Sequence, residues 1–271
     1  MVLVTGCRSG IGYETALAFA RRGDRVYATL RDPSTGGRLR DAVAAERLPV
    51  LVAGLDVTDG DAIVRMTQRV IADEGRIDVL INNAGVAGTF AAIEELDESE
   101  MRASFETNFW GPFRLCRAVL PHMRAAGSGV IVNLSTIGVE LPGTATMSMY
   151  ATSKVALTRL TETLQSEVSP FGIRVLAAEP GMFATNIYDA PKRSAVDPRS
   201  PYSAMVAEVD GWVYDGIAAG AEPAIVAAAL VAAVDDPATP TRFFVGADAV
   251  ALVAALRDGQ MAEWNRGRAT G

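Results

Sequence analysis

The feature that most constrains the fold is an alternation of short apolar runs with longer amphipathic segments. An apolar run bounded by turn residues predicts a buried strand, and apolar residues spaced three and four apart predict a helix. Strand and helix in repeated alternation are typical of a parallel sheet that helices cover on both faces. The expected strands are Val2–Thr5, Arg25–Leu30, Val50–Leu55, Val79–Asn82, Gly129–Leu134, Ile173–Ala178 and Arg242–Val245.

Amphipathic segments separate these runs and predict the helices. The order implies an α/β fold, a doubly wound parallel sheet of seven strands with right-handed crossovers. No linker interrupts the chain, so we expect a single domain over residues 1–271. The expected helices are Ile11–Arg22, Gly36–Ala45, Asp59–Asp73, Glu98–Ala125, Met149–Val168, Pro223–Val234 and Asp248–Leu256.

Residues 182–220 break the alternation. This segment contains Pro191, Pro198 and Pro201 and follows the sixth expected strand, so it should lie above the carboxyl ends of the strands. Open α/β sheets bind their ligands there. We expect a helical insertion near the C-terminus that closes as a lid over a substrate pocket. Its candidate pocket residues are Met182, Phe183, Ile187, Tyr188, Tyr202, Met205, Trp212 and Tyr214.

Composition argues against several classes of protein. The chain has a formal net charge of −7 and no run of Lys or Arg, so a nucleic-acid partner is not expected. The longest apolar stretch, Ala224–Val234, is too short to span a bilayer. Met1 leads directly into a strand pattern, so no signal peptide is expected. Two cysteines make no disulfide framework and the single histidine, His122, builds no metal site, so we expect a cytoplasmic protein without a metal.

A glycine-rich loop, T-G-C-R-S-G-I-G at Thr5–Gly12, joins the first strand to the first helix. Glycine leaves backbone N–H groups accessible, and a helix N-terminus favours an anion, so the loop favours a phosphate. The alternative is a tight strand–helix turn without a ligand. No Lys-Ser/Thr pair follows the last glycine, which excludes a P-loop. The candidate contacts are Gly6, Arg8, Ser9, Gly10, Ile11 and Gly12.

A tyrosine and a lysine, Tyr150 and Lys154, stand four residues apart at the start of an expected helix. Residues at this spacing share a helix face. A cation near a phenol favours the phenolate and lowers its pKa from about 10. The pair therefore favours proton transfer by the tyrosine. The alternative is an ordinary surface pair on an amphipathic helix.

These motifs, with others in order, resemble the short-chain dehydrogenase/reductase family. The resemblance covers Met1 to about Gly246, and Y-A-T-L-R-D with the nearby G-R-L is similar to estradiol-type hydroxysteroid and retinol dehydrogenases. It implies a Rossmann-type fold. The motifs are T-G-x-x-x-G-x-G at 5–12, L-D-V-T-D at 55–59, N-N-A-G at 82–85, Asn108 in E-T-N-F-W-G, Y-A-T-S-K at 150–154 and E-P-G-M-F-A-T at 179–185.

The resemblance implies hydride transfer between a nicotinamide and a carbonyl carbon. Tyr150 is then the general acid/base, and Lys154 also bonds to the nicotinamide ribose. Asn108 holds a water that relays protons from Lys154; the alternative for Asn108 is a helix-kink or capping amide. Further implied cofactor contacts are Asp56 and Val57 at the adenine, Asn82, Ala84 and Gly85 at the ribose, and Pro180, Gly181 and Thr185 at the nicotinamide.

The family also places a hydroxyl after the fifth strand to stabilise the oxyanion. Relatives carry it thirteen residues before the tyrosine, which here is Ile137 and cannot serve. Strand register places Thr136 at the matching position instead, so Thr136 is the first candidate. Ser135 is the second, if the backbone shifts.

The end of the second strand bears on the choice of cofactor. An enzyme that prefers NAD usually has an acid there for the adenine ribose, whereas here Leu30 is followed by Arg31. A guanidinium suits a 2′-phosphate, and Arg8 with Ser9 adds to it. Asp32 leaves NAD open if the register slips by one or two residues. We expect NADP(H) over NAD(H).

The sequence thus predicts a ketoreductase-type enzyme, an NADP(H)-dependent oxidoreductase that interconverts a ketone and a secondary alcohol on a bulky hydrophobic substrate. A steroid-, retinoid- or polyketide-like compound fits equally. The alternatives are an NADP(H)-binding sensor or scaffold without turnover, and a dehydratase or epimerase. By resemblance, we expect a homodimer or homotetramer that pairs through Glu98–Ala125 and Met149–Val168.

Overall fold

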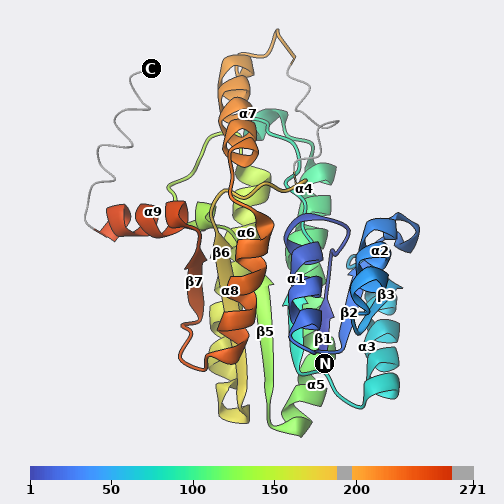
Figure 1. Ribbon diagram of the computed structural model, residues 1–271. Coiled ribbons are helices and arrows are strands. Elements are labelled where there is room, and N and C mark those ends of the chain that lie inside the picture. The colour runs from blue at the N-terminus through green and yellow to red at the C-terminus, as the bar shows by residue number, and fades with distance from the viewer. Residues whose placement is uncertain (188–196, 258–271) are drawn as a thin grey trace.

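The structure, a computed structural model, describes residues 1–187 and 197–257 and contains one parallel sheet between two layers of helices (Figure 1). Its seven strands run in the order β3-β2-β1-β4-β5-β6-β7, and every pairing is parallel. This confirms the predicted doubly wound sheet. The strands are β1 Val2–Val4, β2 Val26–Leu30, β3 Val50–Gly54, β4 Val79–Asn82, β5 Gly129–Leu134, β6 Ile173–Pro180 and β7 Arg242–Val245.

The strand order reverses at β1. The chain runs outward from β1 to β3 and then returns to place β4 on the other side of β1. At such a reversal, open α/β sheets bind their ligands beyond the carboxyl ends of the strands, which here is the edge that carries the loops after β1 and β4.

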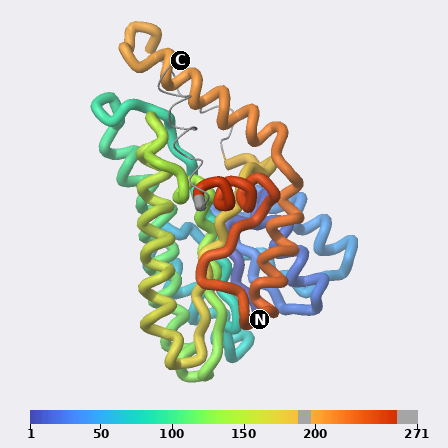
Figure 2. Tube along the Cα trace, turned by 90° about the vertical axis from the view of Figure 1, so that its left-hand side faces the viewer, coloured from blue at the N-terminus to red at the C-terminus, as the bar shows by residue number. Residues whose placement is uncertain are grey.

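The helices lie on both faces of the sheet, as Figures 1 and 2 show from two sides. Alternate residues of a strand point to opposite faces, so Val4 packs into the core beneath α1 and α8 whereas Leu3 packs beneath α3 and α5. The α-helices are α1 Gly10–Arg21, α2 Gly37–Glu46, α3 Gly60–Glu74, α4 Glu98–Phe105, α5 Gly111–Ala126, α6 Ser148–Val168, α7 Ser203–Ala218, α8 Pro223–Asp235 and α9 Ala247–Arg257. Short 3-10 turns lie at η1 Pro33–Thr35, η2 Ile93–Glu95, η4 Ile137–Glu140 and η5 Ser169–Phe171.

One predicted helix is interrupted. The expected helix Glu98–Ala125 is α4 and α5 joined by a π-helical turn, η3, at Glu106–Trp110. A π turn inserts a residue into the helical ladder and re-aims the side chains around it. Here that residue set includes Asn108.

The segment 182–220 contains α7, which stands above the carboxyl edge of the sheet (Figures 1 and 2). Val206, Val209 and Val213 on one side of α7 pack around Phe90, from the loop after β4. The predicted helical insertion is therefore present. Tyr188 and Pro191 lie outside the described residues.

Within the described ranges, no helix combines the length and the apolar composition that a membrane crossing needs.

Candidate active site

The glycine-rich loop is shaped by close approach of two backbones. Gly6 and Gly10 have φ of 73° and 57°, values that residues other than glycine rarely adopt. A Cβ on Gly6 would lie 2.8 Å from Cα of Ala84, and one on Gly12 would lie 2.3 Å from Nδ2 of Asn83. Glycine is thus needed here because the loop after β1 packs directly on the loop after β4.

Thr5 and Asn83 hold these two loops together. Nδ2 of Asn83 donates to the carbonyl oxygens of Thr5 at 2.8 Å and Gly6 at 3.1 Å. In return, Oγ1 of Thr5 accepts from the backbone N–H groups of Asn83 and Ala84, both at 3.0 Å. Sequence reasoning missed both side chains, although the tandem asparagines offered a signal. Asn82 is the last residue of β4 and Asn83 begins the loop, so the two amides have different partners.

The other asparagine, Asn82, points into the sheet. Its Nδ2 donates to Oδ1 of Asn133 on β5 at 2.8 Å, and Asn133 donates to Oγ1 of Thr161 on α6. The Nδ2 group of Asn82 thus joins β4 to β5, and the ribose contact expected of this residue stays a prediction.

The N-terminus of α1 suits an anion. Within the described residues, Ser9 occupies the N-cap without a side-chain cap hydrogen bond, and the first turn has no acidic side chain. The first N–H groups of a helix lack intrahelical partners, and its N-terminus is electropositive. With the exposed Arg8 beside them, these residues fit a phosphate group of a dinucleotide.

The end of β2 has a definite register. Leu30 is buried, and Arg31 and Asp32 follow it on the surface. The Asp32 carboxylate caps η1, since its Oδ1 accepts from N and Oγ of Ser34 at 2.9 and 2.7 Å. These hydrogen bonds lower the pKa of Asp32. Asp32 is thus already committed, whereas Arg31 makes no hydrogen bond or ion pair among the described residues.

The expected adenine contacts lie at the end of β3. Oδ1 of Asp56 accepts from N and Oγ1 of Thr58 at 2.9 and 2.8 Å, which forms a local turn. Val57 is buried against Gly111. A Cβ added to Gly111 would lie 3.1 Å from the Val57 side chain.

A cavity of about 510 Å³ begins at the glycine loop and extends toward α7. It brings together nine of the expected site residues: Ile11, Gly85, Ser135, Thr136, Tyr150, Lys154, Pro180, Gly181 and Thr185. The other expected site residues do not line it: Gly6, Arg8, Ser9, Gly10, Gly12, Arg31, Asp56, Val57, Asn82, Ala84 and Asn108.

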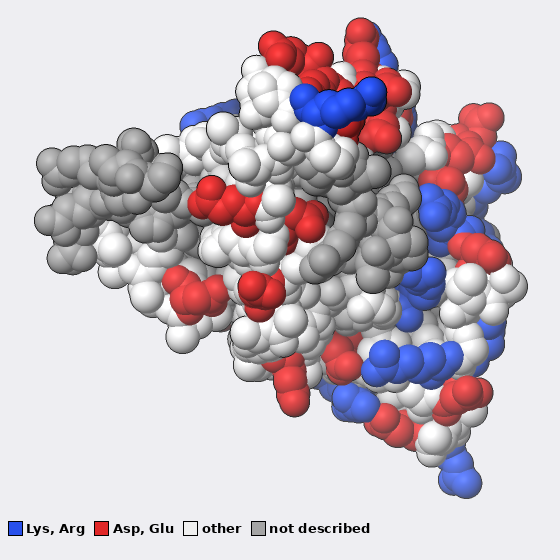
Figure 3. Space-filling model, turned by 90° about the horizontal axis from the view of Figure 1, so that it is seen from above, with Lys and Arg blue, Asp and Glu red and all other residues white. Residues whose placement is uncertain are grey.

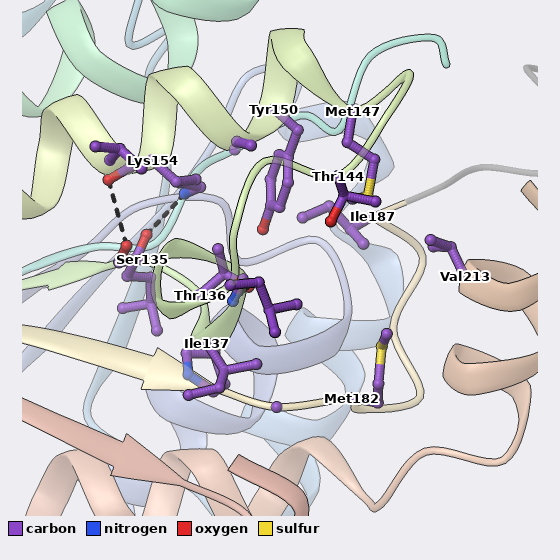
Figure 4. A pocket seen from close by; sticks show the side chains of 18 of the residues that line it. Ser135, Thr136, Ile137, Thr144, Met147, Tyr150, Lys154, Met182, Ile187 and Val213 are labelled. Atoms are coloured by element: carbon purple, nitrogen blue, oxygen red, sulfur yellow. Dashed lines mark hydrogen bonds between the residues drawn. The ribbon is translucent and has the colours of Figure 1, made fainter. Parts of the chain in front are cut away.

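Tyr150 and Lys154 project from the first turns of α6 into this cavity (Figure 4). Nζ of Lys154 lies 5.8 Å from the centre of the Tyr150 ring and donates to the carbonyl oxygen of Leu134 at 2.7 Å. Burial lowers the pKa of Lys154 to about 8.

The expectation that Tyr150 has a lowered pKa is wrong for the chain alone. Burial raises the pKa of Tyr150 to about 12, and a hydrogen bond with Thr136 only partly opposes this effect. The physical reason is that desolvation of a buried phenolate outweighs the attraction of an ammonium held nearly 6 Å from the ring. Tyr150 is accordingly protonated at neutral pH.

The two candidate hydroxyls face different partners. Thr136 caps η4, where its Oγ1 accepts from N of Gly138 at 3.2 Å, and it also bonds with Tyr150. Ser135 lies 2.7 Å from Oγ1 of Thr158 and donates to the carbonyl oxygen of Lys154 at 3.4 Å. Figure 4 shows Ser135 beside Lys154 and Thr136 beneath the Tyr150 ring.

Asn108, in the π turn, is fully buried and uses its amide within the protein. Its Nδ2 donates to the Val86 carbonyl oxygen at 2.8 Å and to Oγ of Ser153 at 2.9 Å, and its Oδ1 accepts from N of Val86 at 2.9 Å. Asn108 therefore fastens the loop after β4 to α6, and Ser153 is a partner that sequence reasoning missed.

The far part of the cavity has apolar walls, and Figure 4 shows Met182, Ile187 and Val213 on the side opposite Lys154. Of the expected pocket residues, Met182, Phe183, Ile187 and Trp212 line it. Tyr202, Met205 and Tyr214 do not, because the periodicity of α7 turns them elsewhere: Tyr202 packs in the Phe90 cluster and Met205 is 44% exposed. Further apolar residues line the cavity: Leu141, Pro142, Met147, Val213 and Ile217.

Among residues 1–187 and 197–257, no three acidic, histidine or cysteine side chains come together to hold an ion. The two cysteines, Cys7 and Cys116, are buried thiols, and burial raises the pKa of each to about 12.

Comparison with known families gives a match over residues 1–194 to the short chain dehydrogenase family. The 3-ketodihydrosphingosine reductase of Bacteroides thetaiotaomicron is 38% identical over 190 residues, which are 70% of this chain and 66% of the relative. The 17-beta-hydroxysteroid dehydrogenase type 1 of Homo sapiens is 37% identical over 187 residues, 67% of this chain and 56% of the relative. The chain thus spans less than two thirds of either relative.

Solved structures agree over a greater length. A short-chain dehydrogenase from Streptomyces avermitilis is 40% identical, covers 100% of this chain with 97% of its own, and has a TM-score of 0.82. A metagenomic short-chain oxidoreductase in complex with NADP is 26% identical, covers 90% of this chain with 96% of its own, and has a TM-score of 0.73.

Proposed function

The chain belongs to the short-chain dehydrogenase/reductase family, and on that premise we propose that it is an NADP(H)-dependent oxidoreductase that interconverts a ketone and a secondary alcohol. One observation carries the proposal. Tyr150, Thr136 and Lys154 meet in a cavity that reaches Ile11 of the glycine-rich loop. A proton donor, a hydroxyl and an ammonium thus lie beside the place where a dinucleotide fits.

The bound nicotinamide supplies the hydride in reduction and accepts it in oxidation. Tyr150 gives its proton to the carbonyl oxygen as the hydride reaches the carbonyl carbon, and takes a proton from the alcohol in the reverse direction. Its pKa of about 12 keeps the phenol protonated and ready to donate. Thr136 donates its hydroxyl hydrogen to the developing oxyanion.

Thr136 is favoured over Ser135 for this role because it bonds with Tyr150, whereas Ser135 is engaged with Thr158 and the Lys154 backbone. Lys154 holds positive charge near the phenol and would hold the nicotinamide ribose of a bound cofactor. Asn108 supports Tyr150 and Lys154 indirectly, since its amide bonds to Val86 and to Ser153, which lies on the same helix as Tyr150 and Lys154. This use favours a structural role over a water-holding one for the Asn108 side chain.

A preference for NADP(H) over NAD(H) rests on the end of β2. Arg31 is exposed there and offers a guanidinium to a 2′-phosphate, while the Asp32 carboxylate accepts hydrogen bonds from Ser34. Figure 3, which looks down on the molecule from above, has Lys and Arg side chains gathered toward the side of α2 and β3. The neighbour crystallised with NADP is in keeping with this preference.

The substrate in this proposal is bulky, neutral and hydrophobic. Among the described residues that line the cavity, Lys154 is the one charged side chain, and it lies at the cofactor end. Residues 182–220 act as a wall or lid of the pocket within a single domain, since Met182, Ile187 and Trp212 contribute to it. Apolar walls with few polar groups are typical of sites for hydrophobic ligands.

A homodimer or homotetramer that pairs through α5 and α6 is part of the proposal. Trp110 at the start of α5 is 40% exposed, packs edge-on against Phe113 and lies outside the cavity lining. Apolar side chains at this exposure suit an interface. Light scattering on the wild type and on Trp110→Asp tests it, and a monomeric wild type would contradict it.

The test of the function is a hydride-transfer screen on the purified chain. NADPH oxidation is followed with aliphatic, aromatic and steroidal ketones, and each is paired with an analogue of similar size that carries a carboxylate. We expect turnover with the neutral bulky ketones and little with the charged partners. Cofactor binding without turnover on any ketone or alcohol would favour the sensor or scaffold alternative.

A further inference from the structure

One guanidinium joins two of the loops that build the candidate site. Arg242, the first residue of β7, donates from Nε and Nη2 to the two carboxylate oxygens of Glu179 on β6, at 2.8 and 2.9 Å. Its Nη2 also bonds with Glu140, the last residue of η4. These residues come from three separate stretches of the chain, so the bonds fix β6, β7 and η4 relative to one another.

Burial makes this arrangement strict. Glu179 is fully buried, and burial raises its pKa while Arg242 opposes that effect. A buried carboxylate is tolerated only with a partner, and a bidentate guanidinium is the best-matched one. The partnership also raises the pKa of Arg242, chiefly through its bond with Glu179. Glu179 therefore fixes the position of the Arg242 guanidinium, and Glu140 bonds to a side chain that cannot move freely.

Glu140 is attached in turn to the reacting groups. It ends the single turn of η4, whose N-cap is Thr136, and Thr136 bonds with Tyr150. The residues that follow Glu140, Leu141 to Thr144, line the cavity. Glu179 stands directly before Pro180 and Gly181, which line the cavity from the other side. Arg242 does not line the cavity itself, so any effect on the chemistry passes through these loops.

We propose that Arg242, through Glu140, is a positioning residue that holds the η4 loop and with it the Thr136 hydroxyl in register with Tyr150. Glu179 is the buried anchor of this device. The inference rests on the proposed function, because it concerns the geometry of the same proton and oxyanion groups.

The deciding experiment compares two glutamates on the same guanidinium, Glu140→Gln and Glu162→Gln. Glu162 lies on α6, 3.8 Å from Nη1 of Arg242, and also pairs with Arg159. The side chains of Glu140 and Glu162 are 25% and 27% exposed, and each substitution removes one negative charge. Only Glu140 belongs to the loop that carries Thr136, so Glu162 is a matched control for charge and exposure.

Glu140→Gln is expected to lower kcat about tenfold through misplacement of the loop, with an unchanged Kd for NADPH and an unchanged Tm. Glu162→Gln is expected to keep the wild-type kcat. Equal losses in both variants, or a wild-type kcat in Glu140→Gln, would overturn the inference and leave the proposed function standing. A wild-type chain without turnover would overturn both.

A second pair of variants covers the anchor. Arg242→Met strands the Glu179 carboxylate and is expected to lower both Tm and kcat. Arg174→Met is its control, because Arg174 on β6 donates to the carbonyl oxygens of Ala233, Val234 and Asp236, far along the strand from the site. It is expected to lower Tm alone. If Arg174→Met reduced kcat as much as Arg242→Met does, the positioning role would be wrong.

Discussion

The candidate site has a nucleotide half, at the loops after β1 and β4, and a substrate half beneath α7, and the two are held together by different kinds of contact. In the nucleotide half, the loops after β1 and β4 touch through backbone atoms, and Gly6 and Gly12 are present because nothing larger fits. In the substrate half, α7 is held by side chains: Phe90 packs among its valines, and Ser200 donates to Glu95 at 2.6 Å just before the helix begins.

This difference explains why one half is rigidly specified and the other is free to vary. A backbone contact tolerates no added atom, so the glycine spacing is fixed by sterics. A side-chain contact tolerates exchange of one apolar group for another of similar volume. The nucleotide half can therefore keep one cofactor while the substrate half changes its ligand.

The largest effect on this comparison is expected from Thr136→Val, at the junction of the two halves. It removes the hydroxyl that faces Tyr150 and keeps the volume, so kcat should fall about a hundredfold to a thousandfold. Ser135→Ala should leave most of kcat and cost about 1 kcal/mol of stability through the lost bond with Thr158. Steady-state kinetics and thermal denaturation check both predictions. A larger kcat loss in Ser135→Ala than in Thr136→Val would make Ser135 the hydroxyl that stabilises the oxyanion.

Gly12→Ala tests the steric claim for the nucleotide half. The new methyl would lie 2.3 Å from Asn83 and 2.4 Å from the Gly6 carbonyl oxygen, so NADPH should bind about tenfold to a hundredfold more weakly, as expected for about 1–3 kcal/mol of overpacking. Gly37→Ala on α2 is the control, since a Cβ there meets no atom within 4 Å. Fluorescence titration measures both, and tight binding by Gly12→Ala would break the distinction between the halves.

Arg31→Ala sharpens the comparison at the cofactor. Loss of a charge-assisted bond to a 2′-phosphate should raise the KM for NADPH about tenfold and leave that for NADH unchanged. Arg40→Ala is the control, because Arg40 donates to the Pro33 carbonyl oxygen instead. Equal changes in KM for NADPH and NADH would contradict a contact between Arg31 and the 2′-phosphate.

The smallest effect is expected from Phe90→Leu in the substrate half. Phe90 lies behind α7 rather than in the cavity wall, so a loss of about 1 kcal/mol of packing should shift α7 slightly and raise the substrate KM a few-fold. The Kd for NADPH should not change. A change in cofactor affinity would show that the two halves are coupled more tightly than their contacts indicate.

The contrast between the halves also describes what sequence could predict. All seven strands lie within a residue or two of their expected bounds, because buried parallel strands are plain apolar runs. The glycine-rich loop could be predicted equally well, since the glycines that its conformation requires stand in one short stretch of sequence. For the catalytic hydroxyl, strand register points to Thr136 and counting back from Tyr150 points to Ile137, because the length of the intervening loop can vary. The role of Thr136 stays a prediction.

What sequence could not predict depends on contacts distant in the chain. The π turn at Asn108 is stabilised by Val86 and Ser153, which are 22 and 45 residues away. Asn83 rather than Asn82 joins the two loops because β4 ends at Asn82, whose amide bonds to β5, and Asn83 is the first residue of the loop. The side chains of α7 that reach the cavity follow from its packing on Phe90, and the raised pKa of Tyr150 follows from burial that the sequence does not display.

The most direct test of the central claim is Tyr150→Phe, which removes one oxygen atom from the cavity and nothing from the nucleotide loop. Turnover and NADPH affinity should be measured on the same preparation, with Tyr13→Phe, a tyrosine buried on α1, as the control. Loss of a general acid should lower kcat about a hundredfold to ten-thousandfold while the Kd for NADPH stays at its wild-type value. Undiminished turnover in Tyr150→Phe would contradict the account, because no other phenol in the described part of the cavity could donate the proton.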